Sequence, residues 1–323
     1  TMCKDIKIKS NFESFLIDNI KNYFPLSYLE NYKKIKKKTQ KEFNYNPNFI
    51  VSSVNHIHND FKKFWIAESI KKKTKFVTMQ HGGGMGSSLF NSGEYLDIKN
   101  SNKYLSWGWK DNAKVLPNFM TLKRSNNRSG KKILLVLYGF PKYANKILPN
   151  LDQDPNITFF KRQMCFLKKI DKNIYKELIV RVPQFLHLKK FYKDEIKKIS
   201  REINFDENEA LKDSIQSARM LITTFNSTVF LEGISSGCPT LGIWEKDTSL
   251  LRNSVIKDYK ILKENHIIFD KFDKAANLIN KEFKNIEKWW LNNKRFKIKK
   301  SFIKKFCNTS EKVNPKVKKI FIN

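Results

Sequence analysis

The sequence predicts an α/β protein with two domains, each built on a parallel sheet flanked by helices. Its 323 residues suffice for two separate cores, and a hydrophobic content of 40% excludes wholesale disorder. Short apolar segments alternate with helical patterns along most of the chain. Because strand-helix-strand connections are right-handed, this alternation favours parallel strands, and ligands then bind beyond the carboxyl ends of those strands.

Residues 1–125 predict a first α/β domain. Helical patterns cover residues 11–38 and 60–71. Three apolar segments predict strands at 48–53, 75–80 and 103–107. Three strands are fewer than a full domain of this kind contains, so we expect a reduced or shortened first domain. Thr1 before Met2 also leads us to expect that the natural chain begins elsewhere.

Residues 122–131 lose their apolar side chains and predict a linker, after which a second domain spans 131–285. Its expected strands lie at 132–138, 177–182, 219–223, 239–244 and 266–269. Its expected helices lie at 159–170, 189–199, 209–218 and 227–235. The remaining segment, 286–323, is expected to be helical, with Phe296 and Phe302 among basic residues. That amphipathic pattern favours either docking on an anionic membrane or packing back on the first domain.

A formal net charge of +32 attracts phosphates, nucleic acid or anionic lipid. The excess is mostly lysine scattered among Asn and Ile, which an A+T-rich coding genome also produces without selection for binding. Four distant cysteines predict neither a zinc site nor a disulfide framework, and no apolar stretch is long enough to span a bilayer. We expect a cytoplasmic protein, with peripheral contact to the inner membrane face as an open option.

A glycine-rich loop, QHGGGMG at residues 80–86, follows the strand expected at 75–80. Glycines let backbone amides approach an anion, so the loop predicts a phosphate or carboxylate cradle. A neutral imidazole suits general base catalysis near pH 7, which makes His81 the first catalytic candidate. A tight turn in which His81 only caps nearby backbone is the alternative. The other loop residues expected at the substrate are Gln80, Gly82, Gly83, Gly84 and Gly86.

Two further groups of titratable residues are candidates. Glu94 and Asp97, on the segment after the loop, are alternative catalytic bases, because a carboxylate in a partly closed cleft can accept a proton. His56 and His58 follow the strand expected at 48–53 and either contact substrate or belong to a polar loop. No third ligand accompanies this histidine pair, so a metal site is not predicted.

Asn226, Ser227 and Thr228 follow the strand expected at 219–223. Such residues cap helices, and the exposed amides of a helix N-terminus favour a diphosphate. Glu232, about one turn further, can accept hydrogen bonds from ribose hydroxyls; a capping box that only holds the helix is the alternative. Arg181, after the strand expected at 177–182, either supplies a cation to the same phosphates or is one of many structural basic residues.

The string RMLITTFNSTVFLEGISSGCPTLGIW at 219–244 resembles the donor half of GT-B glycosyltransferases. Upstream, NFIVSSVNHIHNDFKKFWIAE, TMQHGGGMG and GEYLDIKNSNKYLSWGW are similar to a family of bacterial surface-polysaccharide transferases. The resemblance implies two Rossmann-like domains and transfer of a sugar from a nucleotide sugar to a glycan or lipid-linked acceptor, such as O-antigen or capsule. It also implies that Glu232 contacts ribose, Ser227 and Thr228 the phosphate, and His81 the acceptor or sugar.

The resemblance further implies a reaction with no metal held by an Asp-x-Asp motif, and no cofactor is expected. Asp152-Gln153-Asp154 precedes Pro155 in a polar loop and follows no expected strand. Basic side chains and helix N-termini would then neutralise the leaving phosphate.

Two other functions remain as alternatives. The HGGG string and Gly233-Ile-Ser235-Ser-Gly237 imitate esterase motifs, with Ser235, Asp258 and His266 in triad order. Ser235, however, is expected at the end of a helix and not on the strand-to-helix turn that a nucleophile elbow needs. A non-catalytic nucleic-acid binder would explain the charge, but no nucleic-acid-binding motif is present and the glycine loop would be unexplained. No specific nucleic-acid partner is therefore expected.

Overall fold

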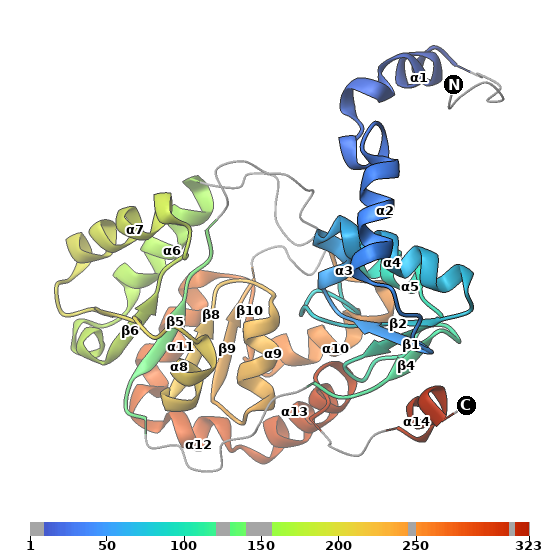
Figure 1. Cartoon of the computed structure of the whole chain (residues 1–323). Helices are drawn as coiled ribbons and strands as arrows, with labels where there is room; N and C mark the ends of the chain where they lie inside the picture. The colour runs from blue at the N-terminus through green and yellow to red at the C-terminus, as the bar shows by residue number, and fades with distance from the viewer. Residues whose placement is uncertain (1–9, 121–129, 140–156, 245–249, 310–313, 323) are drawn as a thin grey trace. The chain divides into compact units, whose positions relative to one another are not determined.

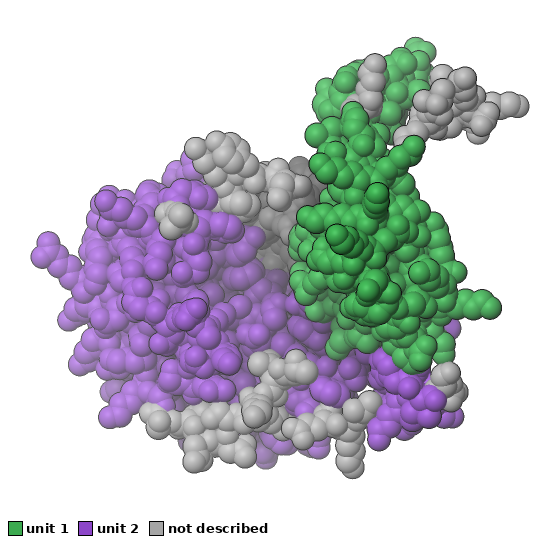
Figure 2. Space-filling view, viewed as in Figure 1, with its two compact units in different colours: residues 1–79, 101–103 green, residues 80–100, 104–323 purple. Residues whose placement is uncertain are grey.

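The computed structural model describes residues 10–120, 130–139, 157–244, 250–309 and 314–322. The chain divides into two compact units (Figure 2): unit 1 comprises residues 1–79 and 101–103, and unit 2 comprises residues 80–100 and 104–323. The domain ranges expected from the sequence, 1–125, 131–285 and 286–323, stay predictions. Most of the expected linker at 122–131 lies outside the described residues.

Unit 1 combines N-terminal helices with a parallel pair of strands (Figure 1). Its elements are α1 (Asn11–Tyr23), η1 (Leu26–Tyr28), α2 (Tyr32–Glu42), β1 (Phe49–Ser52), α3 (Asn55–His58), α4 (Asp60–Lys71) and β2 (Lys75–Met79). The single helical pattern expected at 11–38 is therefore two helices. Phe24, directly before Pro25, has extended backbone angles, as a residue before proline favours, and α1 ends there.

Strands β1 and β2 of unit 1 form a parallel pair, in which Ile50 lies opposite Phe76. These two side chains and Ile66 of α4 form a small buried cluster, against which Trp65 packs. The apolar residues that predicted the first two strands thus form the core of this unit.

Unit 2 contains a six-stranded sheet with helices on both sides (Figure 1). The strands are β5 (Ile133–Val136), β6 (Leu178–Arg181), β7 (Asn204–Phe205), β8 (Met220–Thr223), β9 (Thr240–Ile243) and β10 (Ile268–Phe269). Their order is β10-β9-β8-β5-β6-β7, and every adjacent pair is parallel. The chain builds outward from β5 in one direction and then from β8 in the other. This is the doubly wound order, and its switch point lies between β5 and β8.

The described helices of unit 2 are α5 (Ser92–Asn100), α6 (Ile157–Lys169), η2 (Lys172–Glu177), α7 (Leu186–Ile199), α8 (Leu211–Ser217), α9 (Thr228–Ser235), α10 (Asn253–Glu264), α11 (Phe272–Glu282), η4 (Phe283–Asn285), α12 (Ile286–Trp290), α13 (Asn293–Phe306) and α14 (Pro315–Ile322). Side chains of β5 alternate between the two faces: Ile133 and Leu135 join the main core with Phe166, whereas Leu134 packs with Ile215 of α8.

Unit 2 also contains a second group of parallel strands, β3 (Lys103–Ser106, whose first residue belongs to unit 1) and β4 (Val115–Pro117). The expected fold class, α/β with parallel sheets flanked by helices, is confirmed. The sequence pattern missed β4 and β7, because two or three residues are too short for an alternating or apolar run to be recognised.

Helix α13 confirms the helical pattern expected around Phe296 and Phe302. Its Phe302 is buried and its ring lies 5.4 Å from the ring of Tyr259, whereas Phe296 is exposed. Phe302 therefore belongs to the core of unit 2 and is not available to a membrane. Just after the helix, Asn308 donates from its backbone amide to the Trp107 carbonyl oxygen at 2.8 Å. Within the described ranges, no helix combines the length and apolar character that crossing a bilayer requires.

Candidate active site at the glycine loop and helix α9

Gln80 attaches the glycine loop to the turn that contains Trp107 and Trp109. Its Nε2 donates to the carbonyl oxygens of Gly82 at 3.0 Å and Met85 at 3.2 Å. Its Oε1 accepts from the Trp107 amide at 2.8 Å and from Trp109 Nε1 at 2.7 Å. The side chain expected at the substrate is buried, and both ends of its amide are occupied by the protein. Gln80 therefore shapes the loop, and the two tryptophans of the WGW string are its partners.

Two loop glycines are required by close contacts. Gly86 has a φ of +80°, and a Cβ there would lie 2.3 Å from Trp109 Nε1. At Gly83 a Cβ would lie 2.4 Å from the backbone nitrogen of Thr228. At Gly82, by contrast, a Cβ would meet nothing within 4 Å. Gly84 closes the turn, because its carbonyl oxygen accepts from the Ser88 amide at 2.9 Å.

The loop meets the amino end of α9. The Gly83 amide donates to Thr228 Oγ1 at 3.0 Å, and Thr228 is the first residue of the helix. His81 stands two residues before Gly83; it is half-buried, and its Nδ1 is shielded from solvent. The histidine expected as base and the residues expected at the donor phosphate are thus joined through one loop of unit 2.

The segment between the end of β8 and the start of α9 contains polar oxygens that have no hydrogen-bond partner among the described residues. Within the described ranges, Thr223 Oγ1, Asn226 Oδ1 and Ser227 Oγ are shielded from solvent and make no hydrogen bond. Ser227 has the extended backbone of an N-cap residue, yet its side chain makes no capping bond, so the capping box is not formed. Buried polar atoms are normally satisfied, so the unsatisfied oxygens of Asn226 and Ser227, directly before α9, are candidate ligand contacts.

Glu232 lies one turn into α9 and is half-buried. Burial raises the pKa of its carboxyl group, and no cation in the described part of the chain pairs with it. A partly desolvated carboxylate of this kind is a strong hydrogen-bond acceptor for hydroxyl groups.

The switch point of the sheet is braced by Gln163 of α6. This fully buried residue accepts at Oε1 from the Tyr138 amide at 3.0 Å and from Thr224 Oγ1 at 3.1 Å, and its Nε2 donates to the Tyr138 carbonyl oxygen at 2.9 Å. The Tyr138 ring lies 4.4 Å from the ring of Phe225. Gln163 thereby connects the residues that follow β5 and β8. Sequence reasoning missed it; the only signal is a glutamine on the apolar face of α6.

Arg181, at the end of β6, is already paired. Its Nη1 donates to Asp206 Oδ2 at 2.7 Å and to the Asn208 carbonyl oxygen at 2.9 Å, and its Nη2 donates to the Glu209 carbonyl oxygen at 3.2 Å. The guanidinium therefore holds the segment after β7. A phosphate contact for Arg181 stays a prediction, and these bonds favour the structural alternative.

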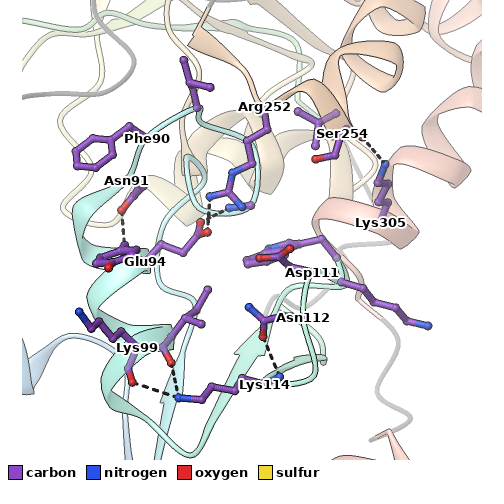
Figure 3. A pocket seen from close by; sticks show the side chains of 17 residues that line it. Phe90, Asn91, Glu94, Lys99, Asp111, Asn112, Lys114, Arg252, Ser254 and Lys305 are labelled. Atoms are coloured by element: carbon purple, nitrogen blue, oxygen red, sulfur yellow. Dashed lines mark hydrogen bonds and ion pairs between the residues drawn. The ribbon is translucent and has the colours of Figure 1, made fainter.

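Glu94 and Asp97 are both buried on α5. Glu94 Oε2 accepts from the Gly86 amide at 2.5 Å, and its Oε1 forms an ion pair with Arg252 (Figure 3). Arg252 Nε in turn donates to the Ser88 carbonyl oxygen at 2.8 Å. Burial raises the pKa of Glu94, while Arg252 and the Gly86 amide oppose this rise. Both carboxylate oxygens of Glu94 are thus occupied in holding the far end of the glycine loop.

His56 and His58 belong to unit 1 and lie on the one-turn helix α3. His56 Nδ1 is 2.9 Å from Ser52 Oγ, and its ring lies 5.4 Å from the ring of Phe76. His58 is exposed. The contacts of His56 are those of a residue packed on its own unit, and its contact with substrate stays a prediction.

The esterase alternative is wrong. Ser235 is the last residue of α9, and its Oγ donates to the Glu232 carbonyl oxygen at 3.2 Å. It therefore does not stand on a strand-to-helix turn. Asp258 pairs with Lys305 at 2.5 Å, and the His266 ring stacks on Phe269.

Among the described residues, no cluster of three His, Cys, Asp or Glu side chains has the arrangement of a metal site. Within the part of the chain that the structure describes, Cys165, Cys238 and Cys307 form no disulfide. Cys3 and the Asp152-Gln153-Asp154 string lie outside the described residues.

Several solved structures are similar to this chain. TarM of S. aureus, solved with UDP and α-GlcNAc-glycerol, has a TM-score of 0.49 at 11% identity, covering 84% of this chain and 55% of that one. The chain thus spans about half the length of TarM. HepE of Anabaena, solved with UDP and glucose, has a TM-score of 0.49 at 11% identity, covering 91% and 86%. MurG of Acinetobacter baumannii has a TM-score of 0.45 at 7% identity, covering 88% and 76%.

No curated protein sequence matches the chain. A family model does: the one described as LIC12162 family transferase matches residues 1–321. Since this match covers nearly the whole chain, the protein is an enzyme of the transferase class and belongs to the LIC12162 transferase family.

Proposed function

We propose that this transferase moves a glycosyl group from a nucleotide-activated sugar to a saccharide acceptor. The observation that carries the proposal is the hydrogen bond between Gly83 and Thr228, which brings the glycine loop to the amino end of α9. This contact lies beside β8, at the switch point of a doubly wound sheet, where such folds bind nucleotides.

The donor diphosphate would lie at the amino end of α9. Free amides in the first turn of a helix carry partial positive charge, which favours an anion there. Asn226 Oδ1 and Ser227 Oγ, which have no partner in the described part of the chain, would bind the sugar or ribose hydroxyls. Glu232 would accept from the ribose, since its carboxylate is half-buried and unpaired by any described cation.

His81 is our candidate base. An acceptor hydroxyl must lose its proton as the anomeric bond breaks, and a neutral imidazole suits that task. The support is its place in the loop, two residues from the Gly83 amide that contacts α9. We propose a metal-independent reaction, in which the helix N-terminus and loop amides stabilise the leaving phosphate.

We further propose that the acceptor is a bacterial surface glycan, free or lipid-linked, such as O-antigen or capsule, and that the protein contacts an anionic membrane peripherally. For the membrane, the support comes from α1, where Phe12 and Phe15 are 67% and 57% exposed, and from Phe24 directly after it, which is 47% exposed. Sedimentation with vesicles that contain phosphatidylglycerol tests this: replacement of Phe12 and Phe15 by Ser should reduce the bound fraction, and unchanged binding would exclude α1 as the anchor.

The first test of the donor is thermal shift with UDP, GDP, dTDP and CMP. A ligand that binds only the folded state stabilises it by about 2.7 kcal/mol when present at about 100 times its Kd. We expect one nucleotide to raise the melting temperature selectively. If none of the four nucleotides raised the melting temperature measurably, a nucleotide-sugar site would be contradicted.

The second test separates catalysis from binding. His81→Ala should lower transfer by about 100-fold or more, while the nucleotide-induced shift stays at its wild-type value, because a base contributes to the reaction and not to donor binding. His187→Ala is the matched control, since His187 is exposed on α7 and belongs to no candidate site. Wild-type turnover in His81→Ala would remove the histidine from the mechanism.

A further inference from the structure

Unit 2 contains a cavity that the donor site does not use. Its volume is about 700 Å³, within the usual range for small-molecule sites. Figure 3 shows its wall, which is formed by α5, the turn after Trp109, the start of α10 and the end of α13. None of the residues from Asn226 to Glu232 lines it, but Gly86 does.

The glycine loop therefore borders both the proposed donor site and this cavity. Gly83 contacts α9 on the side of the proposed donor, and Gly86 forms part of the cavity wall. Glu94 fixes this part of the loop through the Gly86 amide and its ion pair with Arg252. A transferase needs its second substrate close to the first, and this cavity adjoins the same short loop.

The charge of the cavity wall is positive. Five cations line it against two carboxylates, Glu94 and Asp111, so the difference is +3. Three of the cations are engaged: Arg252 by Glu94, Lys305 by Asp258, and Lys114 by carbonyl oxygens at the end of α5. The other two lining cations are Lys99 and Lys110.

Within the described ranges, neither Lys99 nor Lys110 pairs with a carboxylate, and Lys99 Nζ lies over the Tyr95 ring at 5.6 Å. Two ammonium groups at one cavity favour an anionic ligand, because it would form charge-assisted hydrogen bonds that water only partly replaces.

The cavity also presents aromatic surface. Phe90 and Tyr95 line it, yet they remain 56% and 59% exposed. Large aromatic side chains at the mouth of a pocket offer flat apolar faces, on which the C–H face of a sugar ring can pack. Asn112 and Ser254 supply polar groups to the same wall. Aromatic faces combined with two cations fit an acidic sugar better than a neutral one.

We propose that this cavity binds the acceptor and that the acceptor is an acidic saccharide. Its ring would pack on Phe90 and Tyr95, and its carboxylate or phosphate would be bound by Lys99 and Lys110. The proposal rests on the proposed glycosyl transfer, since it names the class of acceptor for that reaction. The binding itself can nevertheless be measured without any sugar transfer.

The test is calorimetric titration of the whole chain with three probes: trigalacturonate, mannose 6-phosphate and the neutral sugar maltotriose. We expect one of the two acidic probes to bind at least about tenfold more tightly than maltotriose. The acidic probe that binds distinguishes a carboxylate ligand from a phosphate ligand. Equal binding of all three, or no binding of either acidic probe, would overturn the proposal.

Variants assign the binding to this cavity. Replacing Lys99 and Lys110 together by Ala should weaken the acidic probe by about tenfold or more, and Tyr95→Ala should weaken it as well. The matched control replaces two exposed lysines that do not line the cavity, Lys288 and Lys300. An equal loss in the control pair would mean attraction by the overall charge and would overturn the site.

Nucleotide-induced thermal shifts in the same variants separate the two proposals. A lost acidic-probe signal with a retained nucleotide shift supports the cavity. An intact acidic-probe signal with no nucleotide shift in the wild type would leave the cavity supported and the donor site contradicted.

Discussion

Gly83 and Thr228 are joined by a hydrogen bond of 3.0 Å from the glycine amide to the threonine hydroxyl oxygen, although 145 residues separate them in the sequence. The backbone of the loop comes so close to α9 that a Cβ at position 83 would lie 2.4 Å from the Thr228 nitrogen. Any residue larger than glycine must push the loop away from the helix. The contact therefore depends on the glycine itself.

Gly83→Ala should destabilise the protein by about 1–3 kcal/mol and abolish most transfer, because backbone atoms have to move to accept the methyl group. Gly82→Ala is the matched control, since a Cβ there meets nothing within 4 Å. It should change stability by less than about 0.5 kcal/mol. Chemical denaturation and a turnover assay on both variants check this; similar behaviour of the two would contradict the close approach.

Much of the fold could be predicted because most strands of the six-stranded sheet are short apolar runs. Both faces of Ile133–Val136 and Met220–Thr223 are buried, so these strands do not alternate between buried apolar and exposed polar residues. The order of strands, by contrast, depends on which runs pair, and sequence periodicity contains no information on pairing. The switch point between β5 and β8 therefore needed the structure.

The glycine loop was predictable because its glycines permit the close backbone contacts that Gly83 and Gly86 make, whereas the role of His81 stays a prediction. The roles of Gln80 and Glu94 were not predictable, because the same side chains suit both substrate and scaffold. Gln80 is occupied by Trp107 and Trp109, and Glu94 is occupied by Gly86 and Arg252. Contacts over such separations are decided by tertiary packing, which a local pattern does not contain.

Glu232→Gln should stabilise the free protein at neutral pH and weaken nucleotide-sugar binding. Burial raises the pKa of Glu232 above its ordinary value of 4.5. At pH values between 4.5 and the raised pKa of the folded protein, the folded state holds a proton that the unfolded state has released. The stability of the wild type therefore falls as pH rises through this window. Glutamine does not ionise, so the variant does not lose stability over this pH range.

Melting temperatures of wild type and Glu232→Gln should therefore coincide near about pH 4 and diverge toward neutral pH, with the variant higher. Glu264→Gln, at an exposed position of α10, provides the control and should show no divergence. A variant that is less stable at neutral pH would show that the carboxylate is satisfied within the protein.

Glu94→Ala should destabilise the protein by about 3 kcal/mol, at the lower end for a broken buried ion pair, because the Arg252 side chain is 23% exposed and water can reach it. Glu264→Ala, which removes an exposed pair with Lys260, should cost less than about 1 kcal/mol. Urea denaturation measures both.

Glu94→Gln distinguishes the scaffold from a catalytic base. The glutamine side chain keeps the size of glutamate, and its oxygen can still accept from the Gly86 backbone amide. Turnover should therefore fall only as far as the fraction of folded protein falls. A fall in kcat of about 100-fold with stability intact would identify Glu94 as the base.

Lys299→Met should remove a pH-dependent component of stability. Lys299 is buried on α13, where its Nζ donates to the Trp290 carbonyl oxygen at 2.8 Å and lies 3.6 Å from that residue's ring centroid. Burial, with a smaller contribution from Arg295, lowers the pKa of Lys299 to about 8 from 10.5. As pH rises from about 8, the folded state loses a proton that the unfolded state keeps, so stability should increase.

The melting temperature of the wild type should therefore rise relative to that of Lys299→Met between about pH 8 and about pH 10. Below that window both states of the wild type hold the proton, so the difference between the two proteins should be constant. Lys300→Met, at the exposed neighbouring position, should follow the wild type throughout. Parallel curves for wild type and Lys299→Met would mean that water reaches the ammonium group, because a hydrated lysine keeps its ordinary pKa and contributes no such slope.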